Sequence, residues 1–181
     1  MSTSIPRLEM DELRADLADY LAPRVKRLGY LGELFKCAGH APDVTLQFMH
    51  FTDALKDALP DRLTELGALT VASFMENRYE RHQHERLSVK LGFPKEWVAQ
   101  VNQLNPDTAS QLNDLEKAAQ RYALKALHTR GLDTEKEFEA FAALVRPSEA
   151  MAFVLLIGRY VTHAMVVNTL KLAPPVPSIF E

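Results

Sequence analysis

Residues 77–84 read Asn-Arg-Tyr-Glu-Arg-His-Gln-His and hold the densest group of titratable side chains in this chain of 181 residues. Asn77 is a favourable N-cap residue, and Glu80 stands three positions later at the spacing of a capping box, so a helix is expected to begin here. In that helix Asn77, Glu80 and His84 occupy positions i, i+3 and i+7 and share one face. Glu80 therefore has two interpretations, as a capping residue or as part of a polar site.

The segment before this stretch also has the pattern of a helix. Residues 59–65 read Leu-Pro-Asp-Arg-Leu-Thr-Glu, with Pro60 near the first helical position and the acidic Asp61 in the first turn. Glu65 falls near the apolar side of this helix and is expected to point into the protein. Glu65 and His84 thus have two interpretations, as a buried pair that holds two helices in register or as the ends of a catalytic site.

The rest of the chain predicts helices joined by short connections. Most of the ten prolines fall between segments of helical periodicity, and no strand–turn–strand pattern competes with them. The predicted fold class is therefore all-α, in one domain. The Pro-rich tail that starts at residue 173 cannot be helical and should lie extended. The last helix is apolar enough to be buried on more than one side. Further helices are expected at about 10–28, 43–58, 94–103, 110–130, 133–145 and 147–170.

Composition argues against several classes of protein. The net charge is −3 and basic residues alternate with acidic ones, so no nucleic-acid partner is expected. The apolar stretch around residues 151–157 is too short to cross a bilayer, and the N-terminus lacks a signal-peptide pattern, so a soluble, cytoplasmic protein is expected. Cys37 is the only cysteine, which rules out a disulfide within the chain, and it is interpreted as a small core residue.

The order of these motifs resembles the carboxymuconolactone decarboxylase family, whose all-helical fold is shared with alkyl hydroperoxidase D. The resemblance covers residues 42–172, leaving 1–41 as an N-terminal helical extension and 173–181 as a tail. It implies a single-domain alkyl hydroperoxidase D-like helical bundle. The motifs that carry it are Leu-Pro-x-Arg-Leu-x-Glu at 59–65, Tyr-Glu-x-x-x-His at 79–84, Gly-Phe-Pro-x-Glu at 92–96 and Ile-Gly-Arg-Tyr at 157–160.

The peroxidase branch of this family has a signature made of a Glu, eleven residues, a Cys-x-x-Cys pair, three residues and a His. Glu65 and His84 stand at the outer positions with the same spacing, but Asn77 and Glu80 replace the two cysteines. A thiolate is the nucleophile in peroxide reduction, and a second thiol resolves the sulfenic acid that forms. A Cys-x-x-Cys peroxidase mechanism is therefore not open to this chain.

The resemblance to the decarboxylase branch implies a cofactor-free acid–base enzyme, of the decarboxylase or isomerase type, that acts on a small carboxylated or lactone substrate. It implies catalytic roles for Glu65, Glu80 and His84, with Asn77 and Tyr79 binding the substrate. Two alternatives stay open, namely a peroxidase-related antioxidant protein and a non-catalytic helical protein that binds a small ligand or a partner. Because members of the family usually assemble, a homo-oligomer is expected, with a trimer or a hexamer as the stoichiometry.

The remaining histidines carry weaker signals. His82 points away from the face that holds His84 and is expected to be solvated. His163 lies in the last helix beside Arg159 and Tyr160 and is interpreted as a packing or interface residue, with a contribution of this helix to the pocket as the alternative. No spacing matches a defined zinc site such as paired histidines at i and i+4, so no metal site is predicted.

Overall fold

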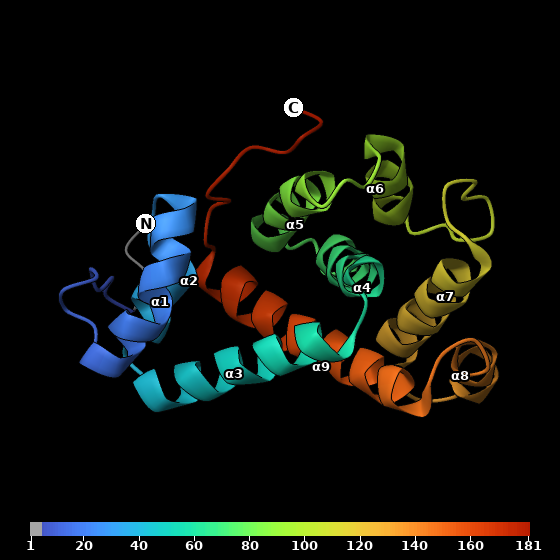
Figure 1. Ribbon diagram of the computed structural model, residues 1–181, viewed down its shortest axis with the longest axis horizontal. Coiled ribbons are helices and arrows are strands. Elements are labelled where there is room, and N and C mark those ends of the chain that lie inside the picture. Colours follow the sequence, from blue (N-terminus) through green and yellow to red (C-terminus); the bar gives the residue numbers. More distant parts are fainter. Residues whose placement is uncertain (1–4) are drawn as a thin grey trace.

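The computed structural model describes residues 5–181, and this part of the chain folds into nine α-helices with no strand. The predicted all-α class is confirmed (Figure 1), and the buried apolar residues form one main core and two smaller clusters. The helices are α1 Ala15–Leu28, α2 Glu33–Ala38, α3 Pro42–Ala58, α4 Asp61–Phe74, α5 Arg78–Lys90, α6 Lys95–Asn102, α7 Asp114–Thr129, α8 Glu135–Ala142 and α9 Pro147–Leu170.

The centre of the fold is the crossing of α4 and α9. Helix α4 packs against α5, α6, α7 and α9, and every residue from Leu63 to Ala72 is buried. Gly67 lies at the contact with α9, where an added Cβ would stand 2.8 Å from Leu156 Cδ2 and 3.1 Å from Phe153 Cε2. The missing side chain thus lets the two helices approach closely, which fixes the position of the polar residues that α4 and α9 carry.

Helix α9 is the longest and most apolar helix of the described chain. It has 24 residues, and its most apolar 18-residue stretch has a mean hydropathy of 1.7, so it is long and apolar enough to span a bilayer by those measures alone. Of that 18-residue stretch, 56% is buried in the fold, as in a core helix. Met151, Leu155 and Met165 remain exposed along it.

Two predicted helices begin later than expected, each for a local reason. Helix α1 begins at Ala15 and not near residue 10, because the backbone of Arg14 is extended. Helix α7 begins at Asp114 and not at residue 110, because Asn113 and Glu116 form a complete capping box, with both hydrogen bonds at 2.9 Å. The helix predicted for residues 133–145 is shorter, at Glu135–Ala142.

The C-terminal tail has no helix, as predicted, and it runs beside α5 (Figure 1). Ser178 Oγ donates a hydrogen bond of 2.6 Å to the buried carboxylate of Glu85, and His82 Nδ1 lies 3.1 Å from the carbonyl oxygen of Val176. The prediction that His82 is solvated is wrong, since only 1% of it is exposed. Local spacing placed it away from His84 but could not show that the tail covers that side of the helix.

Asn77 begins α5 as predicted, while Glu80 does not complete a capping box with it. The Asn77 side chain accepts a hydrogen bond of 3.2 Å from the backbone N–H of Glu80. The reciprocal bond is replaced, because the backbone N–H of Asn77 donates to the carbonyl oxygen of Ala72 at 2.8 Å. The Glu80 carboxylate is therefore turned away from the cap and is free to take part in a polar site.

This capping role predicts that the Asn77→Ala variant is less stable than the wild type. Loss of an Asn N-cap costs about 1 kcal/mol in the free energy of unfolding, which urea denaturation would measure. Asn77→Ser, which can still cap, should keep more of that stability. Equal stability of the two variants would contradict the capping role.

Candidate functional site

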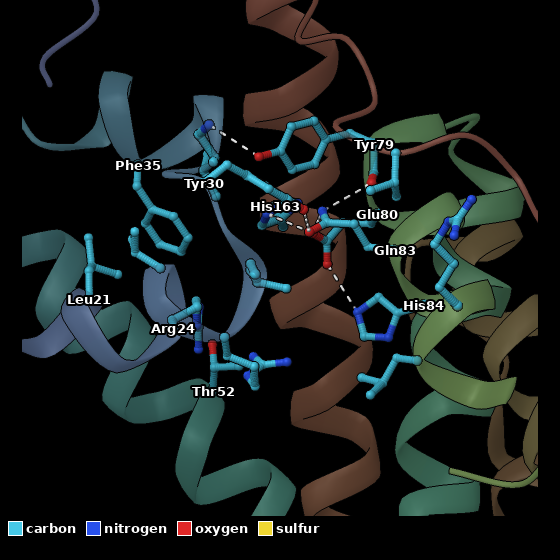
Figure 2. Close-up of a pocket in the computed structure, with 18 of the residues that line it drawn as sticks. Leu21, Arg24, Tyr30, Phe35, Thr52, Tyr79, Glu80, Gln83, His84 and His163 are labelled. Atoms are coloured by element: carbon cyan, nitrogen blue, oxygen red, sulfur yellow. Dashed lines mark hydrogen bonds and ion pairs between the residues drawn. The ribbon is translucent and has the colours of Figure 1, made fainter. Parts of the chain in front are cut away.

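Glu65, Glu80 and His84 meet in one buried row, although they come from two helices. Glu65 lies on α4, and its Oε2 is 2.7 Å from His84 Nδ1. On the other side of the imidazole, His84 Nε2 is 3.2 Å from Oε2 of Glu80, one turn earlier on α5. All three side chains are at most 10% exposed. The histidine therefore stands between two carboxylates, as Figure 2 shows for its contact with Glu80.

Helix α9 adds three polar residues to this row. The hydroxyl of Tyr160 is 3.1 Å from His84 Nε2. His163 Nε2 is 3.3 Å from Oε1 of Glu80, and an η-nitrogen of Arg159 is 3.6 Å from Oε2 of the same carboxylate. Glu80 is thus the shared contact of two histidines and an arginine. Helix α9 supplies three of the six polar residues of the site.

The charges of His84 and Glu80 stabilise each other. Burial on its own lowers the pKa of His84, but the charges of Glu65 and Glu80 and the hydrogen bonds to them outweigh burial and raise the pKa to about 9. Burial raises the pKa of Glu80, yet the influence of His163, His84 and Arg159 is stronger and holds this pKa well below its usual range. At neutral pH His84 is therefore an imidazolium and Glu80 a carboxylate.

The two aromatic residues from α9 remain neutral at neutral pH. Burial lowers the pKa of His163 to about 4, since the opposing effect of Glu80 is smaller and Arg159 and His84 also disfavour a second positive charge. Burial likewise raises the pKa of Tyr160 above its ordinary value, so its hydroxyl keeps its proton and can donate a hydrogen bond.

A cavity of about 240 Å³ opens beside this row. Glu80, His84, Arg159, Tyr160 and His163 all line it. The opposite wall comes from the N-terminal helices and the segment between them, and Figure 2 shows several of these side chains facing the polar residues of α5. The residues that form this wall include Leu21, Arg24, Tyr30 and Phe35. The N-terminal extension therefore forms part of the site.

The two residues predicted to bind substrate are placed differently. Tyr79 lines the cavity, and its hydroxyl accepts a long hydrogen bond of 3.4 Å from the backbone N–H of Leu34. Asn77 is 1% exposed, caps α5 and is not among the described residues that line the cavity. Of the pair, Tyr79 alone is in position to touch a ligand in this cavity.

Sequence reasoning did not assign Arg159, Tyr160 and His163 to the site. His163 alone had an interpretation, as a packing or interface residue, and the structure shows that all three line the cavity next to Glu80. A signal was present, because an arginine and a histidine one turn apart are unusual in so apolar a helix, and buried charges in proteins are paired.

Cys37 lies apart from the cavity. It is 3% exposed and packs in a small cluster with Leu34, Tyr79, Val167 and Leu172, so the core interpretation is confirmed. Burial raises the pKa of its thiol, which disfavours the reactive thiolate. Within residues 5–181, no group of three or more His, Cys, Asp or Glu side chains could hold a metal ion.

Comparisons with known proteins identify the fold. No protein-family model and no curated protein sequence matches the chain. Among solved structures, the apo form of the debrominase Bmp8 matches with a TM-score of 0.83 and 16% identity over 97% of this chain and 94% of that one. The alkylhydroperoxidase AhpD core of an uncharacterized peroxidase-related protein from Ralstonia eutropha JMP134 matches with a TM-score of 0.82 and 20% identity over 95% and 92%.

A shorter structure agrees with these two. The protein of unknown function ATU0492 from Agrobacterium tumefaciens matches with a TM-score of 0.68 and 17% identity over 77% of this chain and 96% of its own. Identities of this size establish the fold and leave the reaction open. The chain has the alkyl hydroperoxidase D-like fold that the order of its sequence motifs predicted.

Proposed function

We propose that this protein is a cofactor-free acid–base enzyme, of the decarboxylase or isomerase type, that acts on a small carboxylated or lactone substrate. The observation that carries the proposal is the row formed by Glu65, His84 and Glu80, whose last two members line a cavity. Enzymes that move protons commonly hold two titratable groups whose surroundings push their pKa values in opposite directions. His84 and Glu80 are such a pair.

Each member of the row has a distinct role in this proposal. Glu65 binds Nδ1 of His84, which fixes the imidazole ring and turns Nε2 towards Glu80 and Tyr160. His84 is then the proton donor at neutral pH, and Glu80 is its partner, whose negative charge keeps the imidazole protonated. Proton transfer between a substrate and two such side chains needs no cofactor.

The charge on the cavity wall supports an anionic substrate. Glu80 is the only carboxylate among the described residues that line the cavity, and it already contacts His84. Basic side chains outnumber it, and they would attract a carboxylate and keep it bound. The basic residues that line the cavity are Arg24, Arg27, Lys56, Arg86, Lys90 and Arg159.

A peroxidase-related function is the second candidate, and the structural neighbours favour it. One of them is peroxidase-related and another is a debrominase. The position of Cys37 weighs against thiol chemistry in this chain, because the thiol is buried and is not part of the described cavity wall. A reductive reaction at this cavity would therefore have to proceed without a cysteine of the chain.

The first prediction of this proposal concerns catalysis by Glu80. Carboxymuconolactone, the compound after which the family is named, serves as the probe, with release of CO₂ and uptake of solvent deuterium as readouts. Glu80→Gln keeps the size of the side chain but removes its charge, so it should lower turnover by a factor of about 10² to 10⁴. Arg121→Gln, which breaks an exposed ion pair with Asp107, is the control and should be fully active.

Two results would count against the acid–base enzyme. One is turnover by Glu80→Gln at the wild-type rate. The other is a wild-type protein that binds carboxymuconolactone without releasing CO₂ or exchanging any proton, which would favour a non-catalytic binding protein. A panel of butenolides and short carboxylic acids in D₂O would extend the second test beyond one compound.

The second prediction concerns the proton on His84. NMR titration of the imidazole should show that it stays charged through neutral pH and loses its proton near pH 9. In Glu65→Gln the pKa should fall, because the neighbouring negative charge is gone. An imidazole that titrates near pH 6.5 in the wild type would contradict the ion-paired row.

The same shift makes protein stability depend on pH in a defined direction. The pKa of His84 is higher in the folded protein than the ordinary value of 6.5, so its ion pairs stabilise the fold fully below pH 6.5. This contribution is lost as the pH rises through about 9. The difference in free energy of unfolding between the wild type and His84→Gln should shrink over that window.

The third prediction separates the two candidate functions. If the protein reduces peroxides through its thiol, Cys37→Ser should abolish the consumption of cumene hydroperoxide in the presence of dithiothreitol. We expect no such dependence, because Cys37 is buried away from the cavity and has no second cysteine to resolve it. Consumption that disappears in Cys37→Ser would reverse this assignment.

A further inference from the structure

Two residues on the cavity wall have buried polar atoms without a hydrogen-bond partner. They are Nη1 of Arg159 and Nδ1 of His163, and neither atom has a hydrogen-bond partner within residues 5–181. Arg159 is 6% exposed and His163 is 2% exposed. A buried polar atom without a partner costs free energy, so two of them at one cavity indicate a ligand that supplies the missing bonds.

Arg159 is held so that its guanidinium can receive an anion. Its Nε donates a hydrogen bond of 2.9 Å to Thr52 Oγ1, and its planar group lies 4.3 Å from the ring of Tyr160 and 4.9 Å from the ring of Phe48. The distance of 3.6 Å from Nη1 to Glu80 is too long for a hydrogen bond. A carboxylate is the ligand group that fits a guanidinium best.

His163 offers the opposite kind of group. Its Nε2 faces Oε1 of the ionised Glu80 at 3.3 Å, so the proton of the neutral ring belongs on Nε2. Nδ1 then carries a lone pair and accepts a hydrogen bond. The charged and titratable groups around the ring are Glu80 and His84 from α5 and Arg159 from α9, with the Tyr79 ring 6.2 Å away.

Arg159 and His163 lie one helical turn apart on α9, at positions i and i+4, and so share one face. We propose that they form a two-point binding site for a small hydroxycarboxylate, or the enol of a keto acid, whose carboxylate binds Arg159 and whose hydroxyl donates to His163 Nδ1. Because Glu80 contacts both residues, such a ligand lies beside the acid–base pair. That the bound ligand is a substrate rests on the proposed function, but its binding can be measured without turnover.

Three related probes test the two contacts separately by isothermal titration calorimetry. Mandelate carries both groups, phenylacetate lacks the hydroxyl, and benzyl alcohol lacks the carboxylate. The wild type should bind mandelate roughly tenfold more tightly than phenylacetate, the effect of one hydrogen bond. It should bind benzyl alcohol more weakly than either carboxylate, because the contact with Arg159 is missing.

Substitutions assign each contact to its residue. Arg159→Gln should weaken both carboxylates by roughly tenfold or more. His163→Phe should remove the preference for mandelate over phenylacetate and leave the affinity for phenylacetate close to that of the wild type. Thr52→Val is the second variant, to be used if Arg159→Gln does not fold. It removes the acceptor of Arg159 Nε while keeping the side-chain shape, so it should weaken the binding of both carboxylates. Arg121→Gln is the control and should bind all three probes as the wild type does.

Nitrogen NMR of the histidine ring adds a readout that packing alone would not change. The Nδ1 resonance of His163 should be that of an unprotonated nitrogen in the free protein, and mandelate should move it further than phenylacetate does. The proposal is overturned if neither carboxylate binds the folded wild type at millimolar concentration, or if benzyl alcohol binds as tightly as mandelate. Mandelate binding together with no turnover of carboxymuconolactone or of the panel of butenolides and short carboxylic acids would keep this site and reject the proposed enzyme.

Discussion

The structure depends on one positive charge placed between two buried carboxylates. Glu65 and Glu80 are both buried near the crossing of the central helices, and two such groups would repel each other without a partner between them. His84 provides that partner by keeping a proton to about pH 9, and in doing so it joins α4 to α5. Removing one member of a buried ion pair leaves an uncompensated charge, so the row that would carry the chemistry also holds the helices together.

Helix α9 brings the second half of the site to this row, and its packing explains how. Gly67 allows α9 to approach α4 closely near Phe153 and Leu156, and the next turns of α9 carry Arg159 and His163 past Glu80. The apolar residues of α9 stabilise the crossing, since burial of apolar surface contributes about 25 cal/mol per Å². That packing offsets the cost of burying an arginine and a histidine, and it holds both at fixed positions.

The sequence predicted most of the helices and one half of the site. Periodicity and prolines locate the helices, and the spacing from Glu65 to His84 places both residues on facing helices. Arg159 and His163 marked α9 as unusual, but the residues that it meets could not be predicted. Tyr160 contacts His84 across 76 positions of the chain, a separation about which local patterns carry no information. The burial of His82 was missed for the same reason, since the covering tail lies 94 positions away.

The balance of charge around His163 suggests how a ligand would change the site it enters. Arg159 is one of the groups that hold the pKa of His163 down, whereas Glu80 opposes that effect. A carboxylate bound to Arg159 would offset the arginine charge and so raise the pKa of His163 towards its ordinary value. The imidazole would then be a better proton acceptor when the ligand is bound than when the cavity is empty. On this argument the anionic substrate itself would supply the charge that prepares a second histidine, and the neutral state of His163 in the free protein would be a resting state.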